Sequence, residues 1–445
     1  MSRIILRGAQ VITLAPDRPD FECVDVAIAG NVIEELGRDL PVGDGQVIDL
    51  SGRIVLPGFV NAHLHTWQTG LRSVAADWPL LEYLIQIRVQ GAKHFTPHDI
   101  HIGTLAGALN QISCGTTTLG DWSHNCATPD HTDAAVEALC SSRIRAVFLQ
   151  GMPLSPPDRR HPREEIERVL RSQGFSSNPL LEIGMAVNGP HYSTSEAALA
   201  DFELAAEYGL VISMHESGGP VADPSAWDAV AAAGLVSSRT NIVHGMELPD
   251  AQLRRLVQLG ATFTCTPENE MSQGHGHPIV GRLVELGANP SLGTDVDSVV
   301  PGEMLGAARF GLAHQRVVEH LRHQEQHGQH SRSSSTTSKQ ALKWATVEGA
   351  KALGLEGQVG VLAPGMQADL VVISARDLNL WPPHDPIATA LQASLANVES
   401  VMIGGRWAKR DGVLVDVDLE SLREDLLRSS TRILDAMGLP SALTA

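Results

Sequence analysis

Short runs of hydrophobic residues alternate with longer amphipathic stretches through the middle of the chain. Apolar residues recur at near-helical spacing between the runs, as in residues 98–113 and 249–259. Eight alternations of this kind predict an α/β fold, a (β/α)8 TIM barrel whose parallel strands are enclosed by helices. The eight strand-like runs are 54–63, 116–121, 144–150, 181–191, 210–215, 241–244, 261–267 and 290–295.

The two ends of the chain have a different pattern, with short β-like runs separated by glycine turns. We expect residues 1–54 and 357–445 to pair into one small β domain beside the barrel of residues 55–356. A helix near residues 418–437 closes the chain, because leucines recur there at helical spacing.

Residues 314–338 interrupt the barrel pattern with histidines set among Gln, Ser and Thr. A histidine-rich tract of this kind is a compositional signal. We therefore interpret it as a polar surface loop or the end of a helix, in preference to a second metal site. The histidines concerned are His320, His323, His327 and His330.

Charge and cysteine content narrow the class of protein. The formal net charge of the 445 residues is −18, which argues against nucleic acid and against anionic membrane surfaces as partners. No run approaches the ~18 apolar residues of a membrane-spanning helix, and the first residues lack the layout of a signal peptide. The five cysteines are scattered without a CxxC pair, so we read them as buried thiols and expect a cytoplasmic protein.

Histidine is the residue that carries the candidate chemistry, with 19 copies in the chain. In a barrel of this type, catalytic groups lie at the carboxyl ends of the strands. His63 and His65 stand two apart at the end of the first run and so point to one face. His215, His244 and Asp295 end the fifth, sixth and eighth runs.

Imidazole and carboxylate are the ligand types expected for zinc or iron. A catalytic metal keeps one position open for water and lowers the pKa of that water toward ~7. In this hypothesis Asp295 both touches the metal and takes the proton of the water, while His244 positions the water or the tetrahedral intermediate.

The ordered motifs resemble those of the amidohydrolase superfamily, in the branch that holds cytosine deaminase, guanine deaminase and the triazine hydrolases. The resemblance covers nearly the whole chain and implies a β-sandwich made from both termini beside the barrel. It also implies metal ligands at His63, His65, His215 and Asp295, with His244 near the bound water, and a homo-oligomer. The motifs are PGFVNAHLH, HLHTWQTGLRS, WPLLEYL, VHG at 243–245, LGTD at 292–295, ATVEGAKALGL and GVLAPGMQADLVV.

Two-metal members of this superfamily resemble one another in a carboxylated lysine that bridges the ions. This chain has no lysine between Lys93 and Lys339. We therefore expect one divalent metal ion per chain, with zinc as the first candidate and iron as the second.

The chain departs from its branch at the proton shuttle. Deaminases of this branch resemble one another in a Glu three residues after the fifth-strand His, and Gly218 stands there instead. Glu216 would face away from His215 on a regular strand, although a bulge could turn it inward. Glu268 and Glu270, after the seventh run, are the other candidates for the acid.

Substrate contacts are predicted from residues that follow the strand ends. Trp67, Gln68, His191 and Trp122 would offer aromatic walls and a few directional polar groups, which suit a flat heterocycle. Arg72 is the one arginine close after the metal pair, and the lack of a cationic cluster argues against a phosphorylated substrate.

These features predict a metal-dependent hydrolase, an aminohydrolase that attacks a small nitrogen heterocycle with activated water and releases ammonia. The alternative is the same scaffold hydrolysing another C–N, C–Cl, C–S or amide bond, because Gly218 removes the usual shuttle. A non-catalytic scaffold protein is the third hypothesis, and the complete ligand set argues against it.

Overall fold

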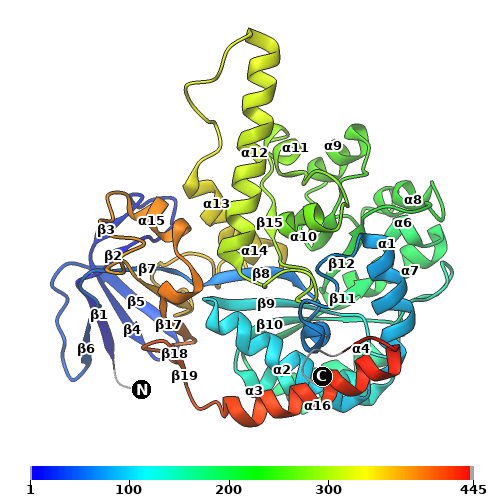
Figure 1. The fold of residues 1–445 in the computed structure, drawn as a ribbon, viewed down its shortest axis with the longest axis horizontal. Helices are drawn as coiled ribbons and strands as arrows, with labels where there is room; N and C mark the ends of the chain where they lie inside the picture. The colour runs from blue at the N-terminus through cyan, green and yellow to red at the C-terminus, as the bar shows by residue number, and fades with distance from the viewer. Residues whose placement is uncertain (1–2, 441–445) are drawn as a thin grey trace.

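Eight parallel strands form a barrel at the centre of the computed structural model, which describes residues 3–440 (Figure 1). Neighbouring strands pair in chain order, and Leu64 bridges Asp295 to join the last strand to the first. The structure therefore confirms the predicted (β/α)8 fold. The strands are β8 (Phe59–Leu64), β9 (Thr116–Ser123), β10 (Arg145–Gly151), β11 (Leu181–Val187), β12 (Val211–Glu216), β13 (Thr240–His244), β14 (Thr262–Cys265) and β15 (Ser291–Leu292).

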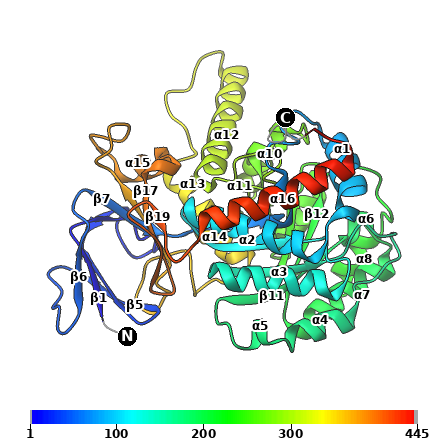
Figure 2. The same ribbon diagram turned by 60° about the horizontal axis from the view of Figure 1, so that its bottom comes forward.

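Helices surround the barrel and follow the strands in sequence. Helix α2 begins at a capping box in which Thr96 and Asp99 bond each other's backbone amides, and α16 lies across it in Figure 2. Among the helices around the barrel are α2 (Pro97–Ser113), α3 (Pro129–Ser142), α4 (Arg163–Leu170), α5 (Gln173–Ser176), α6 (Gly189–Tyr192), α7 (Ser195–Tyr208), α8 (Ala226–Ala232), α9 (Asp250–Gln258), α10 (Pro267–Ser272), α11 (Val280–Glu285), α12 (Met304–His327), α13 (Ser338–Trp344), α14 (Val347–Ala352) and α16 (Leu419–Met437).

The segment between β8 and α2 is a series of short helical turns that passes over the carboxyl ends of the strands. Its residues carry several of the predicted site positions, so its path matters for the site. The turns are η1 (Thr66–Leu71), α1 (Leu80–Tyr83), η2 (Leu84–Gly91, a π-helix) and η3 (Ala92–His94).

The two ends of the chain build two sheets beside the barrel, on the left of Figure 1. Apolar residues from both sheets, including Val26, Ile33 and Val372, pack into one core between them. One sheet has the order β5-β4-β1-β6 and the other β19-β18-β17-β16-β7-β2-β3. The strands are β1 (Ile4–Arg7), β2 (Gln10–Val11), β3 (Glu22–Cys23), β4 (Asp25–Ala29), β5 (Val32–Gly37), β6 (Gln46–Asp49), β7 (Arg53–Pro57), β16 (Leu370–Ser374), β17 (Val398–Ile403), β18 (Arg406–Arg410) and β19 (Val413–Leu414), with α15 (Pro386–Gln392) and η4 (Leu395–Asn397) between them.

The hydrophobic run 54–63 is two strands, although the pattern alone read it as one. Its first half belongs to β7 in the terminal sheets and its second half to β8 in the barrel. Gly58 separates them, and a Cβ there would lie 2.1 Å from the Thr117 side chain. The run is continuous in hydrophobicity because both strands are buried, so periodicity could not show the break.

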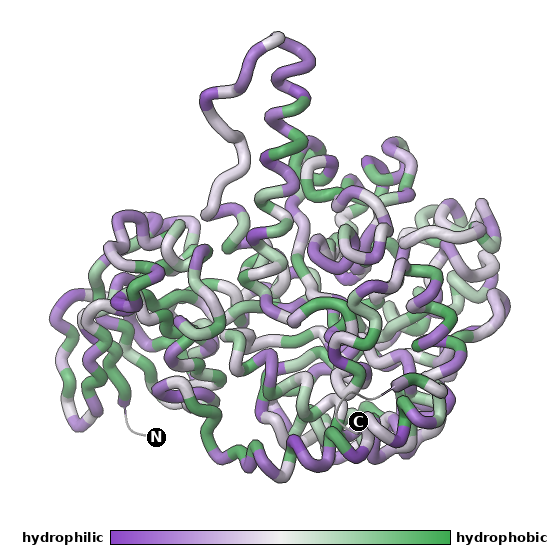
Figure 3. The backbone as a smooth tube through the Cα atoms, in the orientation of Figure 1, coloured by the Kyte–Doolittle hydropathy of each residue, from purple (hydrophilic) through white to green (hydrophobic). Residues whose placement is uncertain are grey.

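The histidine-rich segment is more ordered than the sequence suggested. Helix α12 continues through His327, and the chain then returns along it as a loop, so that the two form an arm that projects from the barrel (Figure 1). The tip of this arm is hydrophilic in Figure 3. His320 lies 3.1 Å from the Ser334 hydroxyl. Among the described residues, no cluster of three potential metal ligands includes these histidines.

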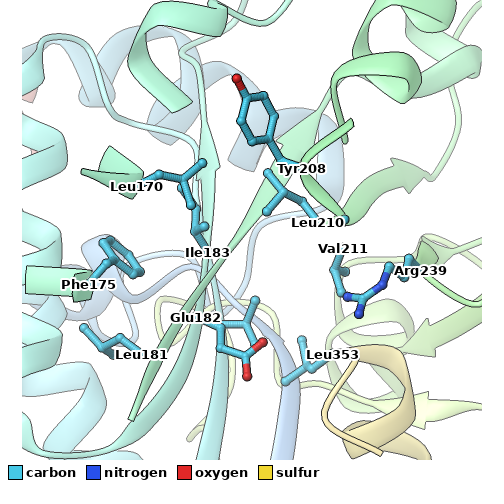
Figure 4. Close-up of a pocket in the computed structure, with 12 residues that line it drawn as sticks. Leu170, Phe175, Leu181, Glu182, Ile183, Tyr208, Leu210, Val211, Arg239 and Leu353 are labelled. Carbon is cyan, nitrogen blue, oxygen red and sulfur yellow. The ribbon is translucent and has the colours of Figure 1, made fainter. Parts of the chain in front are cut away.

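A cavity of about 360 Å³ opens at the amino-terminal ends of β10, β11 and β12 (Figure 4). Apolar side chains such as Leu181 and Leu210 line it, with Glu182 and Arg239 as charged members. This end of the barrel is opposite the end at which catalytic groups are expected, so the cavity is not part of the predicted site.

The cysteines match the prediction only in part. Cys114, Cys126 and Cys265 are buried free thiols, whereas Cys23 is exposed, because it lies in the two-residue strand β3 at the edge of its sheet. No helix within residues 3–440 is long and apolar enough to cross a membrane.

Candidate active site

Four side chains from three distant parts of the chain converge at the carboxyl end of the barrel. His63 and His65 come from the end of β8, His215 from β12 and Asp295 from the turn after β15, and one ligand atom of each lies within 4.8 Å of the others. The Nε2 atoms of His63 and His65 lie 3.2 and 3.4 Å from Asp295 Oδ1, and those of His215 and His63 are 3.3 Å apart. These are the four metal ligands expected from the sequence, now placed around one point.

The protonation states of these groups suit a divalent cation. Burial lowers the pKa values of His65 and His215 well below the usual range, so both imidazoles are neutral at pH 7. His65 donates its Nδ1 proton to the Trp122 carbonyl at 2.7 Å, which leaves the Nε2 lone pair facing the cluster. Neutral imidazole is the form that binds metal, so the donor set fits the expected ion.

Asp295 is ionised despite its burial. Burial opposes ionisation, but the contact with His63 and the imidazoles around it hold the pKa of the Asp295 carboxyl well below its usual range. Asn269 donates a hydrogen bond from Nδ2 to Asp295 Oδ2 at 2.6 Å, which fixes the second carboxylate oxygen. This partner is a residue that the sequence reasoning missed, since the seventh run indicated only that its neighbours were acidic.

Backbone geometry at two site residues is unusual. Asp295 and His244 have φ values of 65° and 71°, in the left-handed region that few residues other than glycine adopt. Barrel closure holds Asp295 there, because its amide donates to His63 O at 3.0 Å and its carbonyl accepts from the His65 amide at 2.8 Å. Strain of this kind is typical of sites where the surrounding fold fixes a functional side chain.

His244 links the cluster to a second buried carboxylate. Its Nδ1 lies 3.1 Å from Glu270 Oε1 and its Nε2 lies 3.7 Å from Asp295 Oδ2. Burial lowers the pKa of His244, but the hydrogen bond to Glu270 and the charge of Asp295 outweigh it and raise the value. Glu270 also accepts from the Thr266 amide at 2.9 Å, so it orients His244 and is held in turn by backbone.

Two predicted site residues bind each other. Glu216 points away from His215, as a regular strand requires, and its Oε1 lies 2.6 Å from His191 Nδ1. The Nε2 of His191 lies 3.2 Å from the Gly219 carbonyl, and the pKa of His191 is raised, chiefly by the hydrogen bond to Glu216.

Glu268 occupies a different environment. Its carboxyl is partly buried, and burial, with the nearby charge of Glu303, raises its pKa. No hydrogen bond between described residues joins Glu216 or Glu268 to the four clustered ligands, so a catalytic role for either stays a prediction.

The predicted aromatic walls are buried behind the cluster. Trp67 donates its Nε1 hydrogen to His124 Nδ1 at 3.1 Å, and its ring lies 4.8 Å from that of Phe95. The Trp122 ring lies 4.2 Å from the His215 ring, and its Nε1 donates to Ser213 Oγ at 3.0 Å.

Gln68 is held in the same region by a hydrogen bond from its Nε2 to the Tyr83 hydroxyl at 2.7 Å. These contacts place Trp67, Trp122 and Gln68 around the ligands. Whether they also contact a substrate stays a prediction.

An arginine that the sequence reasoning overlooked lies near the cluster. Arg72, the arginine singled out from the sequence, forms an ion pair with Asp297 at 3.0 Å. Arg88, on the π-helix η2, forms no ion pair with a described residue, and burial lowers the pKa of its guanidinium to about 10. Burial, and then the charge of Arg88, lowers the pKa of His124 well below its usual range. A cation therefore lies beside the site.

A family model and relatives of known name match most of the chain. A family model described as the amidohydrolase family matches residues 54–408. The chain is 29% identical over 451 residues to a 5-methylthioadenosine/S-adenosylhomocysteine deaminase of Pelotomaculum thermopropionicum, covering 98% of this chain and all of that protein. It is 26% identical over 441 residues to a protein of the same name from Pyrococcus abyssi, covering 96% of this chain and 98% of the relative.

Solved structures share the fold across almost the whole chain. An adenosine deaminase from Xanthomonas campestris with bound zinc superposes with a TM-score of 0.82 at 21% identity, over 98% of this chain and 99% of that one. An atrazine chlorohydrolase from Arthrobacter aurescens, complexed with zinc, gives a TM-score of 0.81 at 20% identity, over 96% of this chain and all of the other.

Proposed function

Because the chain belongs to the amidohydrolase family, we propose that it is a metal-dependent aminohydrolase that exchanges an amino group on a nitrogen heterocycle for oxygen and releases ammonia. The convergence of three imidazoles and one carboxylate at the barrel mouth is the observation that carries this proposal. A hydrolase of carbon–nitrogen bonds, of the deaminase type, is also what the relatives indicate.

One zinc ion per chain is the proposed cofactor, held by His63, His65, His215 and Asp295. The chain has no lysine between Lys93 and Lys339 that could bridge a second ion. A divalent metal in such a site supplies Lewis acidity, which brings the pKa of water to ~7 and makes a hydroxide nucleophile accessible at neutral pH.

Asp295 and His244 are our candidates for handling the proton of the attacking water. Asp295 is ionised, and His244 faces its Oδ2 from 3.7 Å. The carboxylate can accept a proton, and the imidazole, backed by Glu270, can stabilise negative charge that develops on the substrate. Asn269 keeps Oδ2 in a fixed orientation throughout.

The heterocycle is proposed to be a 6-aminopurine nucleoside, since relatives that align over nearly the whole chain are named as deaminases of such compounds. Arg88 adds a positive charge beside the site. A substrate that carries a carbonyl oxygen or an anionic group other than phosphate would be favoured there, because a guanidinium donates charge-assisted hydrogen bonds to such groups. A cytoplasmic location and a homo-oligomer remain expectations from the sequence.

A second candidate keeps the same scaffold with a different leaving group, such as chloride, an alkylamine or an amide. Gly218 favours it, because the chain lacks the acid expected three residues after His215.

Ammonia release from a panel of aminopurines, aminopyrimidines, pterins and triazines tests the proposal, with chloride measured in parallel on chloro analogues. We expect ammonia and the oxo product in equal amounts from at least one aminated purine. Release of chloride without ammonia from any compound would favour the second candidate, and no turnover by metal-loaded protein would contradict both.

A further inference from the structure

Hydrolysis of an aminated carbon needs a proton donor for the leaving group, because an amine departs as ammonia only after it gains a proton. The three carboxylates considered from the sequence each face another charged or titratable group, and no hydrogen bond within residues 3–440 joins them to the four clustered side chains. Glu216 is engaged with His191, Glu270 with His244, and Glu268 lies in the field of Glu303.

Gly218 stands in the loop after β12, at the position where the branch carries a proton-donating Glu. Its φ is 95°, and the Tyr192 hydroxyl donates to its carbonyl at 2.6 Å, which holds the chain in this shape. A Cβ at Gly218 would lie 3.1 Å from Glu247 Oε1 and 3.7 Å from Oε2. The space beside Gly218 therefore contains a carboxylate, contributed by the turn after the neighbouring strand β13.

Glu247 is held at this place by its backbone. It lies three residues after His244, in a turn closed by the hydrogen bond from the Leu248 amide to the Gly245 carbonyl at 3.3 Å. Arg282 donates to the carbonyls on both sides of it, Met246 O at 3.2 Å and Leu248 O at 2.5 Å. The Gly245 amide also donates to Glu216 O at 2.9 Å, which ties this turn to the end of β12.

The Glu247 carboxylate itself is uncommitted. Its side chain is exposed, and no hydrogen bond or ion pair connects it to another residue within 3–440. The pKa of His191 is raised chiefly by its hydrogen bond to Glu216, and the charge of Glu247 adds to that rise, which places Glu247 near this wall of the mouth.

We propose that Glu247 is the general acid for the leaving group, standing in for a side chain that Gly218 lacks. The proposal rests on the proposed aminohydrolase function. The water oxygen bonds to the ring carbon, and the C–N bond breaks with its electron pair going to nitrogen. That nitrogen takes a proton from the Glu247 carboxyl and leaves as ammonia. Asp295 takes one proton from the attacking water, and solvent returns one to Glu247, so that water and the amino compound become ammonia and the hydroxylated ring, which is the enol form of the oxo product.

Paired substrates test this role, namely the aminated heterocycle that the wild type hydrolyses fastest and its chloro analogue, since chloride leaves without a proton. Glu247→Gln is expected to lower kcat on the amino compound by ~10²-fold or more, the range of general acid catalysis, and on the chloro compound by less than ~10-fold. Metal content and the thermal midpoint should stay at wild-type values. The control Glu356→Gln removes an exposed carboxylate from the loop after α14 and should change neither rate.

Glu247→Gln with wild-type kcat on the amino compound, or with equal losses on both compounds, would overturn the role of Glu247 and leave the aminohydrolase function standing. A wild-type enzyme that releases no ammonia from any aminated compound would overturn both. The two failures are therefore distinguishable in one set of assays.

Discussion

The hydrogen bond from Asn269 to Asp295 offers a quantitative test of how the site is built. Asn269→Ala removes the Nδ2 donor that lies 2.6 Å from Asp295 Oδ2, in a side chain that is only 1% exposed. A hydrogen bond to a charged group is worth ~1.5–3 kcal/mol, which corresponds to roughly 10- to 150-fold in an equilibrium constant. The freed oxygen also allows the Asp295 carboxylate to rotate away from the three imidazoles.

We therefore expect Asn269→Ala to weaken metal binding by ~10- to 100-fold, as losses of outer hydrogen-bond partners commonly do. Competition with a chromophoric chelator measures this affinity directly. Asn31→Ala is the matched control, because Asn31 is exposed and its side chain donates to Gln367, in the small β domain. An affinity within about threefold of wild type in Asn269→Ala would refute the idea that this bond orients Asp295.

The remaining predictions concern charge, pH and metal. Arg88→Met should raise KM by ~10-fold for substrates with an anionic or carbonyl substituent and leave kcat nearly unchanged, as steady-state kinetics would show; an unchanged KM would remove Arg88 from the site. Burial raises the pKa of Asp201 to about 7, so the folded state holds this proton more tightly, and the stability that Asp201 contributes is lost as pH rises from ~4 to ~7. Asp201→Asn should remove that slope and be more stable than wild type at pH 8 by ~2–4 kcal/mol in urea denaturation, with little difference at pH 4; equal stability at pH 8 would contradict the burial argument. Removal of metal should lower the thermal midpoint, because the ion held among His63, His65, His215 and Asp295 binds only the folded state. One equivalent of zinc should restore the midpoint, and a midpoint that does not change on metal removal would argue against tight binding.

The residues at the strand ends could be predicted from the sequence, because their positions depend on the alternation within each strand and on the parallel direction of the strands. His63 and His65 share a face through the period of a strand, and parallel strands bring His215 and Asp295 to the same edge. Counting the eight runs left His244 and other strand-end residues as further candidates, and the resemblance to the amidohydrolase superfamily reduced them to the four that the structure brings together. The same alternation left two orientations open for Glu216, and the structure shows its carboxylate in contact with His191.

Contacts between loops could not be predicted in this way. The pairing of Glu216 with His191, the bond from Asn269 to Asp295 and the approach of Glu247 to Gly218 each depend on how turns after different strands are aimed. Periodicity carries no information about such turns. Arg88 was missed for a related reason, since a π-helix does not follow the 3.6-residue repeat.

Two boundaries between elements could not be predicted from the sequence, because the residues on both sides of each are equally buried or equally polar. The run 54–63 is apolar on both sides of Gly58 because both strands are buried, so one strand was read where two exist. Residues up to His327 are helical although they are polar, because the arm of α12 stands in solvent and needs no apolar face beyond its base.

Titration of metal-stripped protein with zinc, followed by the rate of ammonia release, tests whether one metal ion per chain is catalytic. We expect no turnover without metal, a rate that rises in proportion to added zinc, and a break at one equivalent per chain. Full turnover by the stripped protein, or a break at two equivalents, would contradict a single catalytic ion held by His63, His65, His215 and Asp295.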